Sequence, residues 1–156
     1  MIVNTVVNTD PDHAFEIFTS AIDKWWKRTP RHMWRFDAEA TIRFEGDRLL
    51  EVHPDQTFVM GEVSVWDPGK RLIFSWLSPE PADDPPQTEV EVRFEDLRGK
   101  TRIVLEHRGI AGAEVGNTVS SVVGIWWSDL LVGFGAAVFH DQSRRPGSTG
   151  AAQSLM

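Results

Sequence analysis

Alternating hydrophobic and polar positions dominate the middle of the chain and predict β-strands. Residues 88–95, TEVEVRFE, place Val90, Val92 and Phe94 on one side and charged side chains on the other, as in a strand with one buried face. The same period, or runs rich in β-branched and aromatic residues, recurs between short turns such as Gly46-Asp47. We therefore expect an antiparallel sheet with one face in solvent. Its strands are predicted at 2–9, 38–45, 48–53, 57–66, 71–76, 88–95 and 101–107.

Helical signals lie toward both ends of the chain. Thr9 or Asp10 can cap a helix whose first position is Pro11, a residue that suits the first turn. A second short helix is predicted over 20–26. Near the C-terminus, the apolar run predicts a long helix over 117–139. The chain thus combines one sheet with a few helices, an α+β organisation.

The long helix is apolar on more than one side. At about 100° per residue, one stripe forms that we expect to face the sheet, with Trp127 at its edge; it comprises Val119, Val123, Trp126, Leu130, Phe134 and Ala137. Ile125, Val132 and Phe139 lie on the opposite side. A helix with two apolar sides needs a second partner, which is either the N-terminal helices or another subunit.

Four segments carry a resemblance to a known family. They are residues 61–63 (GEV), 67–76 (DPGKRLIFSW), 101–107 (TRIVLEH) and 126–131 (WWSDLL). Their order and spacing resemble the START-like (SRPBCC) superfamily, in the branch similar to the C-terminal domain of the activator of Hsp90 ATPase. The resemblance implies a helix-grip fold, in which a curved antiparallel sheet of six or seven strands wraps a long C-terminal helix. We expect one domain over residues 1–141 and a flexible tail over 142–156.

The resemblance also implies a cavity between sheet and helix that holds a hydrophobic or amphipathic small molecule. It implies no single reaction. A co-chaperone role is not expected, because the eukaryotic activators carry a separate N-terminal docking domain for which this chain has no room. The chain has seven tryptophans and nine phenylalanines, which can line such a cavity, although aromatic residues also fill ordinary cores. The predicted ligand-binding residues are Trp25, Trp34, Phe44, Phe74, Trp76, Phe94, His107, Trp126, Leu130 and Phe134.

A few polar residues decide whether chemistry accompanies binding. Alternation points His107 inward, as a buried imidazole with a partner, or as a ligand anchor or general base. Glu62 either faces the cavity or, in the simpler interpretation, lies in solvent. A cyclase or hydratase would need one of these two groups in the cavity. His53, beside a turn, is expected at the surface. No histidine pair has ligand spacing, so we expect no metal site and no cofactor.

The segment KWWKRTPRHMWR, residues 24–35, mixes cations with indoles. It is either a lid, in which Arg28 or Arg31 meets an anionic head group, or a packed loop with solvated charges. Sixteen basic and 23 acidic residues give a net charge of −7, which argues against nucleic-acid binding. No cysteine is present, and no hydrolase, kinase or dehydrogenase motif is found.

The sequence thus favours a small-molecule binding protein. A cyclase or hydratase and an interaction module that forms a homodimer are the alternatives. The start of the chain lacks signal-peptide character, and no apolar run of about 20 residues is evident. We therefore expect no membrane insertion and a cytoplasmic location.

Overall fold

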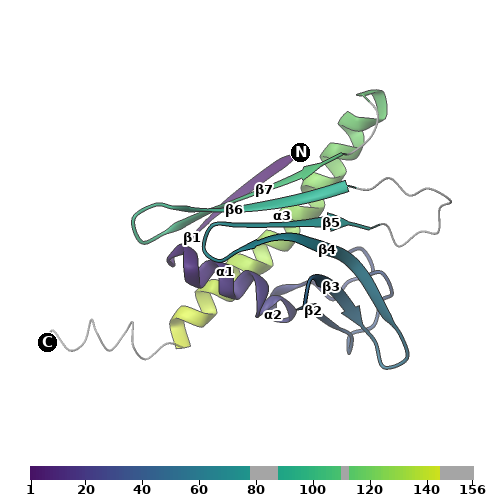
Figure 1. Cartoon of the computed structure of the whole chain (residues 1–156), viewed down its shortest axis with the longest axis horizontal. Helices are drawn as coiled ribbons and strands as arrows, with labels where there is room; N and C mark the ends of the chain where they lie inside the picture. The colour runs from purple at the N-terminus through teal and green to yellow at the C-terminus, as the bar shows by residue number, and fades with distance from the viewer. Residues whose placement is uncertain (78–87, 110–112, 145–156) are drawn as a thin grey trace, which may run out of the picture.

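A seven-stranded antiparallel sheet forms the body of the protein. The computed structural model describes residues 1–77, 88–109 and 113–144, with side chains from residue 122 to 142 in the last segment. The strands are β1 (Ile2–Val7), β2 (Thr41–Glu45), β3 (Arg48–Val52), β4 (Thr57–Asp67), β5 (Arg71–Trp76), β6 (Thr88–Asp96) and β7 (Thr101–Arg108). Their order is β1-β7-β6-β5-β4-β3-β2, so β1 and β2 are the edges (Figure 1). The predicted antiparallel sheet is confirmed, although β2 begins at Thr41 rather than at residue 38.

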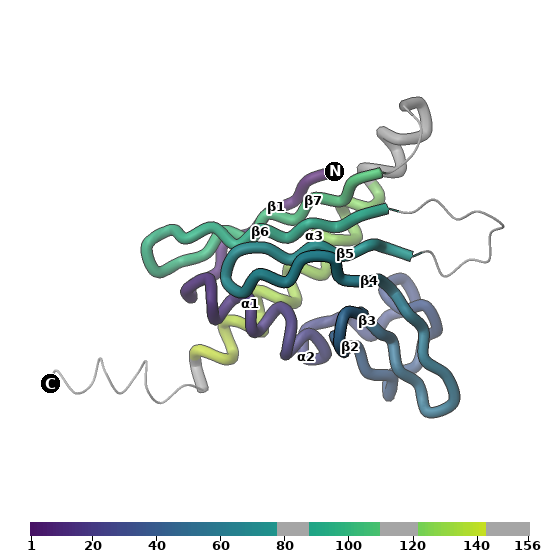
Figure 2. The backbone as a smooth tube through the Cα atoms, in the orientation of Figure 1, coloured from purple at the N-terminus to yellow at the C-terminus, as the bar shows by residue number. Residues whose placement is uncertain are grey.

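Three helices pack on one side of this sheet. They are α1 (Pro11–Thr19), α2 (Ile22–Trp25) and α3 (Ala113–Arg144), and α3 crosses the sheet obliquely (Figures 1 and 2). The Asp10 carboxylate accepts the His13 backbone N–H at 2.8 Å and caps α1, so Asp10 rather than Thr9 is the cap of the two predicted candidates. The helix α3 exceeds its predicted range at both ends. The first three residues of the expected tail are therefore helical; the rest of it, and loop 78–87, lie outside the described residues.

Two irregularities bend the long strand β4. Its register with β3 shifts between Leu49 and Leu50, and its register with β5 shifts between Val63 and Val65. Such bulges change which side of a strand a residue faces. The second shift lets Trp66 contact Phe15 of α1, with ring centroids 5.3 Å apart. Strict alternation along β4 therefore does not describe its two faces.

The buried stripe of α3 differs from the predicted one. Its buried side chains are Trp127, Leu130, Leu131, Phe134 and Val138. Trp127 is 1% exposed, whereas Trp126 is half-buried. The prediction placed Trp126 on the stripe and Trp127 at its edge, and for these two tryptophans it was wrong. Because apolar residues surround this helix, their pattern determined its rotation poorly.

The opposite side of α3 is apolar, and its large side chains are exposed within the described part of the chain. Val122, Ile125, Val132 and Phe139 are all more than half exposed. The segment Val122–Gln142 has a mean hydropathy of 1.7 and is long and apolar enough to cross a membrane, by length and composition only. The prediction that no such segment exists was therefore wrong. The N-terminal helices pack against a different side of α3. They approach it closely at Gly133, where a Cβ atom would lie 2.7 Å from the Trp25 carbonyl oxygen.

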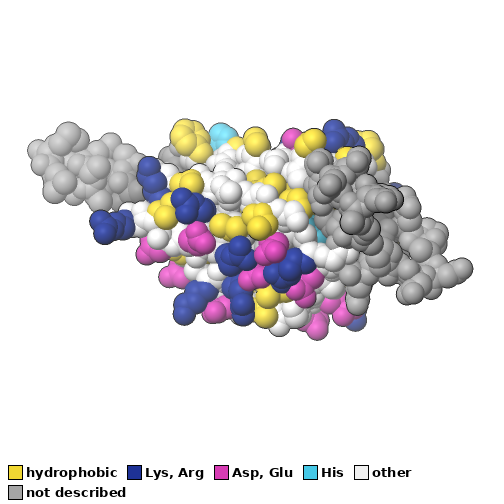
Figure 3. Space-filling model, turned by 90° about the horizontal axis from the view of Figure 1, so that it is seen from above, with side chains coloured by type: hydrophobic (Ala, Val, Ile, Leu, Met, Phe, Trp, Pro, Cys, Tyr) yellow, Lys and Arg dark blue, Asp and Glu magenta, His cyan; other side chains and the backbone are white. Residues whose placement is uncertain are grey.

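The outer face of the sheet is charged and confirms the predicted exposure of one face. Arg108 of β7 pairs with Glu89, with Glu91 at 2.5 Å and with Glu106 at 3.4 Å. Arg93 joins the same network through Glu106 at 3.3 Å. Basic and acidic side chains are interleaved on the face drawn in Figure 3. An apolar ligand therefore has to bind elsewhere, on the helical side of the sheet.

Candidate ligand-binding pocket

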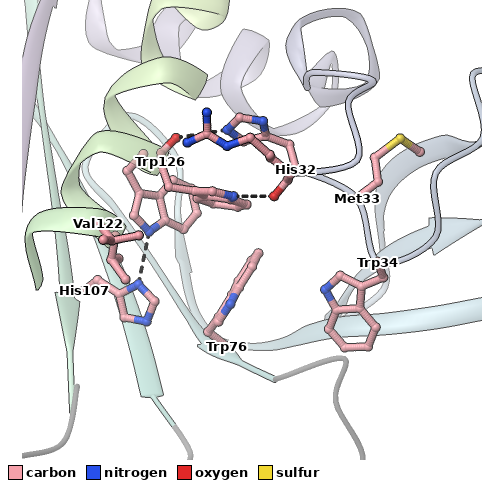
Figure 4. Close-up of a pocket in the computed structure, with 10 residues that line it drawn as sticks. His32, Met33, Trp34, Trp76, His107, Val122 and Trp126 are labelled. Carbon is pink, nitrogen blue, oxygen red and sulfur yellow. Dashed lines mark hydrogen bonds between the residues drawn. The ribbon is translucent and has the colours of Figure 1, made fainter. Parts of the chain in front are cut away.

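A cavity of about 260 Å³ opens where α3 meets the ends of β5 and β7. The loop between α2 and β2 forms its remaining wall; we call residues 27–36 the pocket loop. Four of the lining residues are tryptophans (Figure 4). The described lining residues are Arg31, His32, Met33, Trp34, Trp76, His107, Val122, Val123, Trp126 and Trp127.

The adjacent tryptophans of α3 serve two different surfaces. Their rings are nearly perpendicular, at 85° with centroids 4.9 Å apart. Trp127 enters the core, whereas Trp126 lies against the pocket loop. Trp76 of β5 meets both rings edge to face, each at 5.5 Å. Such T-shaped contacts are favourable beyond the burial of area, so these three indoles form a rigid corner of the pocket.

His107 is buried beside this corner, as the sequence predicted. Its Nδ1 accepts the Trp127 Nε1–H at 3.0 Å. Because an indole nitrogen only donates, the proton of the neutral imidazole is on Nε2, which donates to Thr88 Oγ1 at 2.8 Å. Burial, helped by the positive charge of the N-terminal amine, lowers the pKa of His107 to about 4. The imidazole is therefore neutral at pH 7, with both nitrogens engaged.

The pocket loop is tied to the helices by indole hydrogen bonds. Trp26 Nε1 donates to the His32 carbonyl at 2.8 Å, and Trp126 Nε1 donates to the Arg31 carbonyl at 2.7 Å. The His32 ring stacks on Trp126, with centroids 4.9 Å apart. Its Nδ1 lies 2.8 Å from Thr29 Oγ1 and its Nε2 lies 3.4 Å from the Trp126 carbonyl. Burial lowers the pKa of His32, so this ring too favours its neutral form.

A buried carboxylate holds the far end of the loop. Glu51 of β3 is fully buried, and its two oxygens accept the backbone N–H groups of Trp34 and Arg35 at 2.8 and 2.9 Å. Its Oε2 also lies 2.8 Å from His53 Nε2. His53 is only 4% exposed, so its predicted surface position was wrong. Glu51 therefore tethers the pocket loop to β3. The alternation of residues along β3 does not indicate that a loop covers Glu51 and His53.

The structure divides the ten predicted ligand-binding residues into two groups. Trp34, Trp76, His107 and Trp126 line the pocket. The other six belong to the core or pack against it, outside the described lining: Trp25, Phe44, Phe74, Phe94, Leu130 and Phe134. Trp25, for example, donates its Nε1–H to the Ile17 carbonyl at 3.1 Å. Whether any of the ten binds a ligand stays a prediction.

Several pocket residues were absent from the predicted set. Arg31, His32 and Met33 belong to a loop without periodicity, and only the mixture of cations and indoles in residues 24–35 marked that segment. Trp127, Val122 and Val123 depend on the rotation of α3. Glu62, in contrast, is exposed, and its backbone N–H bonds to Ser75 Oγ at 3.0 Å. The simpler interpretation of Glu62 is thus confirmed.

The described residues hold no group of three or more His, Asp or Glu side chains that could bind a metal ion. The two histidines at the pocket are instead engaged with other side chains or with the backbone. The arrangement can therefore enclose an apolar ring and contact it with fixed aromatic walls. Its histidines offer no free nitrogen for proton transfer unless an existing hydrogen bond breaks.

Comparison with known proteins assigns the chain to a family. A sequence profile described as "Activator of Hsp90 ATPase homolog 1-like protein" matches residues 8–133. No curated protein sequence matches the chain.

Among solved structures, CalC from Micromonospora echinospora, described as a self-sacrificing resistance protein, is 20% identical; the match covers 93% of this chain and 97% of that one, with a TM-score of 0.65. A protein from Mesorhizobium loti has the same TM-score at 13% identity, over 90% and 96% of the two chains. The Aha1 dimer from Colwellia psychrerythraea is 14% identical over 88% and 96%, with a TM-score of 0.61. These similarities show the helix-grip fold.

Proposed function

The chain belongs to the family of Activator of Hsp90 ATPase homolog 1-like proteins, and we propose that it binds a small hydrophobic or amphipathic molecule in the pocket without catalysing a reaction. The observation that carries this proposal is a cavity of about 260 Å³ lined by four tryptophans. Ligand sites are concave and mostly apolar, with a few placed polar groups. The cytoplasmic location and the single-domain organisation expected from the sequence stay predictions.

Binding without catalysis fits the polar groups better than the cyclase or hydratase alternative does. That alternative needs His107 or Glu62 as an acid or base inside the cavity. Glu62 is in solvent, and both nitrogens of His107 are bonded to Trp127 and Thr88. A general base has to reach the proton that it abstracts with a free lone pair.

A dye titration tests the binding proposal. N-phenyl-1-naphthylamine is a neutral probe whose emission rises in apolar sites. We expect saturable binding to the unaltered protein. Val123→Phe places a ring in the pocket and should weaken dye binding by at least about tenfold, because the ring and the dye would compete for the same space. Val132→Phe adds the same ring to the exposed side of α3 and is the matched control. Equal binding by both variants, or none by the unaltered protein, would exclude the pocket as the site.

The exposed apolar side of α3 favours a second property, association of two copies of this chain. Val122, Ile125, Val132 and Phe139 recur at spacings of three and seven residues, as along a helix–helix seam. The Colwellia relative is described as a dimer.

Light scattering at several concentrations tests this association. We expect a dimer that Val132→Glu converts to a monomer, because a charge at the seam would be buried unpaired. Thr57→Glu adds the same charge to β4, far from α3, and should leave the dimer intact. A monomer at every concentration refutes the proposal. A monomer that sediments with phospholipid vesicles would instead assign the apolar side of α3 to a membrane surface.

A further inference from the structure

The side-chain hydrogen-bonding groups left open among the described pocket-lining residues are nitrogen donors. Among the described lining side chains, His32, His107, Trp126 and Trp127 have their polar atoms engaged. The Trp34 and Trp76 indole nitrogens and the Arg31 guanidinium have no acceptor within the described chain. Figure 4 shows the Trp34 nitrogen facing Trp76 across the pocket. Indole and guanidinium groups donate and cannot accept.

The identity of the unpaired cation follows from its neighbours. The sequence left Arg28 and Arg31 as equal candidates for an anion contact. Arg28 is committed: its guanidinium bonds to the carbonyls of Ala40 and Trp26 at 3.1 and 3.0 Å and pairs with Asp23. Arg31 lines the pocket, is exposed, and pairs with no described acid. It is therefore the cation at the pocket that is available to a ligand.

The walls restrict the shape of the ligand. Four indoles surround a cavity of about 260 Å³, which is below the usual range of about 300–1,000 Å³ for drug-sized molecules. Flat rings make offset and edge-to-face contacts with such walls. A molecule of one or two fused rings has the right size and shape.

We infer that the pocket selects a small planar aromatic carboxylate, with its ring among the tryptophans and its oxygens toward Arg31, Trp34 and Trp76. A carboxylate only accepts hydrogen bonds, so it complements a set of donors. Its charge matches a guanidinium in bidentate geometry. An ammonium ligand would find no free nitrogen or oxygen acceptor among the described lining side chains and would be repelled by Arg31. This inference rests on the proposed binding function and adds the chemical class of the ligand.

Calorimetric titration of three probes with one ring system tests the inference. The probes are 2-naphthoate, its neutral methyl ester and the cationic 2-(aminomethyl)naphthalene. We expect 2-naphthoate to bind at least about tenfold more tightly than the amine, since a hydrogen bond to a charged group is worth at least that factor. Arg31→Gln should weaken 2-naphthoate by about tenfold and leave the ester within about twofold.

The control variant is Lys24→Gln, which removes an exposed cation of the same basic segment outside the described pocket lining. It should change none of the three affinities. Arg31→Gln should fold normally, because Trp126 bonds to the backbone carbonyl of that residue and circular dichroism can verify it.

The outcomes separate the two proposals. If the neutral dye binds in the pocket but 2-naphthoate binds no better than the amine, the carboxylate inference is overturned and the binding function stands. The same holds if Arg31→Gln weakens all three probes equally, which would make Arg31 a structural residue. If neither the dye nor any probe binds, the binding function itself fails.

Discussion

Acidification should destabilise the protein through His107, and His107→Asn should remove this effect. The folded state keeps the imidazole neutral, with a pKa of about 4 against an ordinary value of 6.5. The unfolded chain therefore takes up a proton at a higher pH than the folded protein. This contribution is fully present above about pH 6.5 and is lost as the pH falls toward 4.

The size of the effect follows from the pKa shift. At 1.36 kcal/mol per unit, the free energy of unfolding should fall by about 2 kcal/mol between pH 7.5 and pH 5, and by about 3 kcal/mol at pH 4. His107→Asn keeps an acceptor oxygen close to the position of Nδ1, so that Trp127 retains a partner, but the amide does not titrate. Other groups, including His32, are common to both proteins and cancel in the comparison.

Urea unfolding followed by tryptophan emission at pH 7.5 and pH 5 measures both proteins. We expect the unaltered protein to lose about 2 kcal/mol more than His107→Asn. Equal losses would refute the reasoning, because they would mean that His107 titrates in the folded state as it does in water. Its hydrogen bond with Trp127 would then not exclude the protonated form.

Two further substitutions test how the pocket is held. Glu51→Gln replaces one oxygen that accepts a backbone N–H of the pocket loop by an NH₂ group, which donates. The free energy of unfolding in urea should fall by about 2–3 kcal/mol, and dye binding should weaken. Unchanged stability and binding would show that Glu51 does not hold the pocket loop. Gly133→Ala places a Cβ 2.7 Å from the Trp25 carbonyl and should lower stability by about 1–2 kcal/mol despite its better helix propensity. Gly135→Ala, with nothing within 4 Å, should be neutral or stabilising; the reverse order would refute the close approach.

Strands such as β6 and β7 could be predicted well because one face of each lies toward solvent and the other in the core. In β6, alternation of valine with glutamate or arginine leaves only one orientation that buries the apolar side. The strand ends follow from turn residues such as Gly69, whose φ of 76° is readily adopted only by glycine. Local sequence is sufficient to predict a strand and its buried face wherever the two faces differ strongly in polarity.

Prediction from local pattern fails where the two sides of an element differ little in polarity, and where a loop distant in sequence covers a residue. Around α3, apolar side chains occur on every side, so a rotation of one residue exchanged the positions of Trp126 and Trp127. His53 and Glu51 were misjudged or overlooked because a charged residue next to a turn normally lies in solvent. Glu51 accepts backbone N–H groups of the pocket loop, 16 and 17 residues away in the chain, and His53 contacts Glu51. No local sequence pattern records such contacts.

The hydrogen bonds of the indoles connect these observations to function. Trp25, Trp26, Trp126 and Trp127 each donate to an acceptor within the protein. An indole tied in this way fixes its ring and the segment that it reaches, so these four build the frame of the core and the pocket loop. Trp34 and Trp76 have the same apolar surface but no described acceptor, and both line the cavity. An acceptor on a ligand can bond to these two nitrogens without displacing a protein partner, which is why the pocket rather than the core should carry the selectivity.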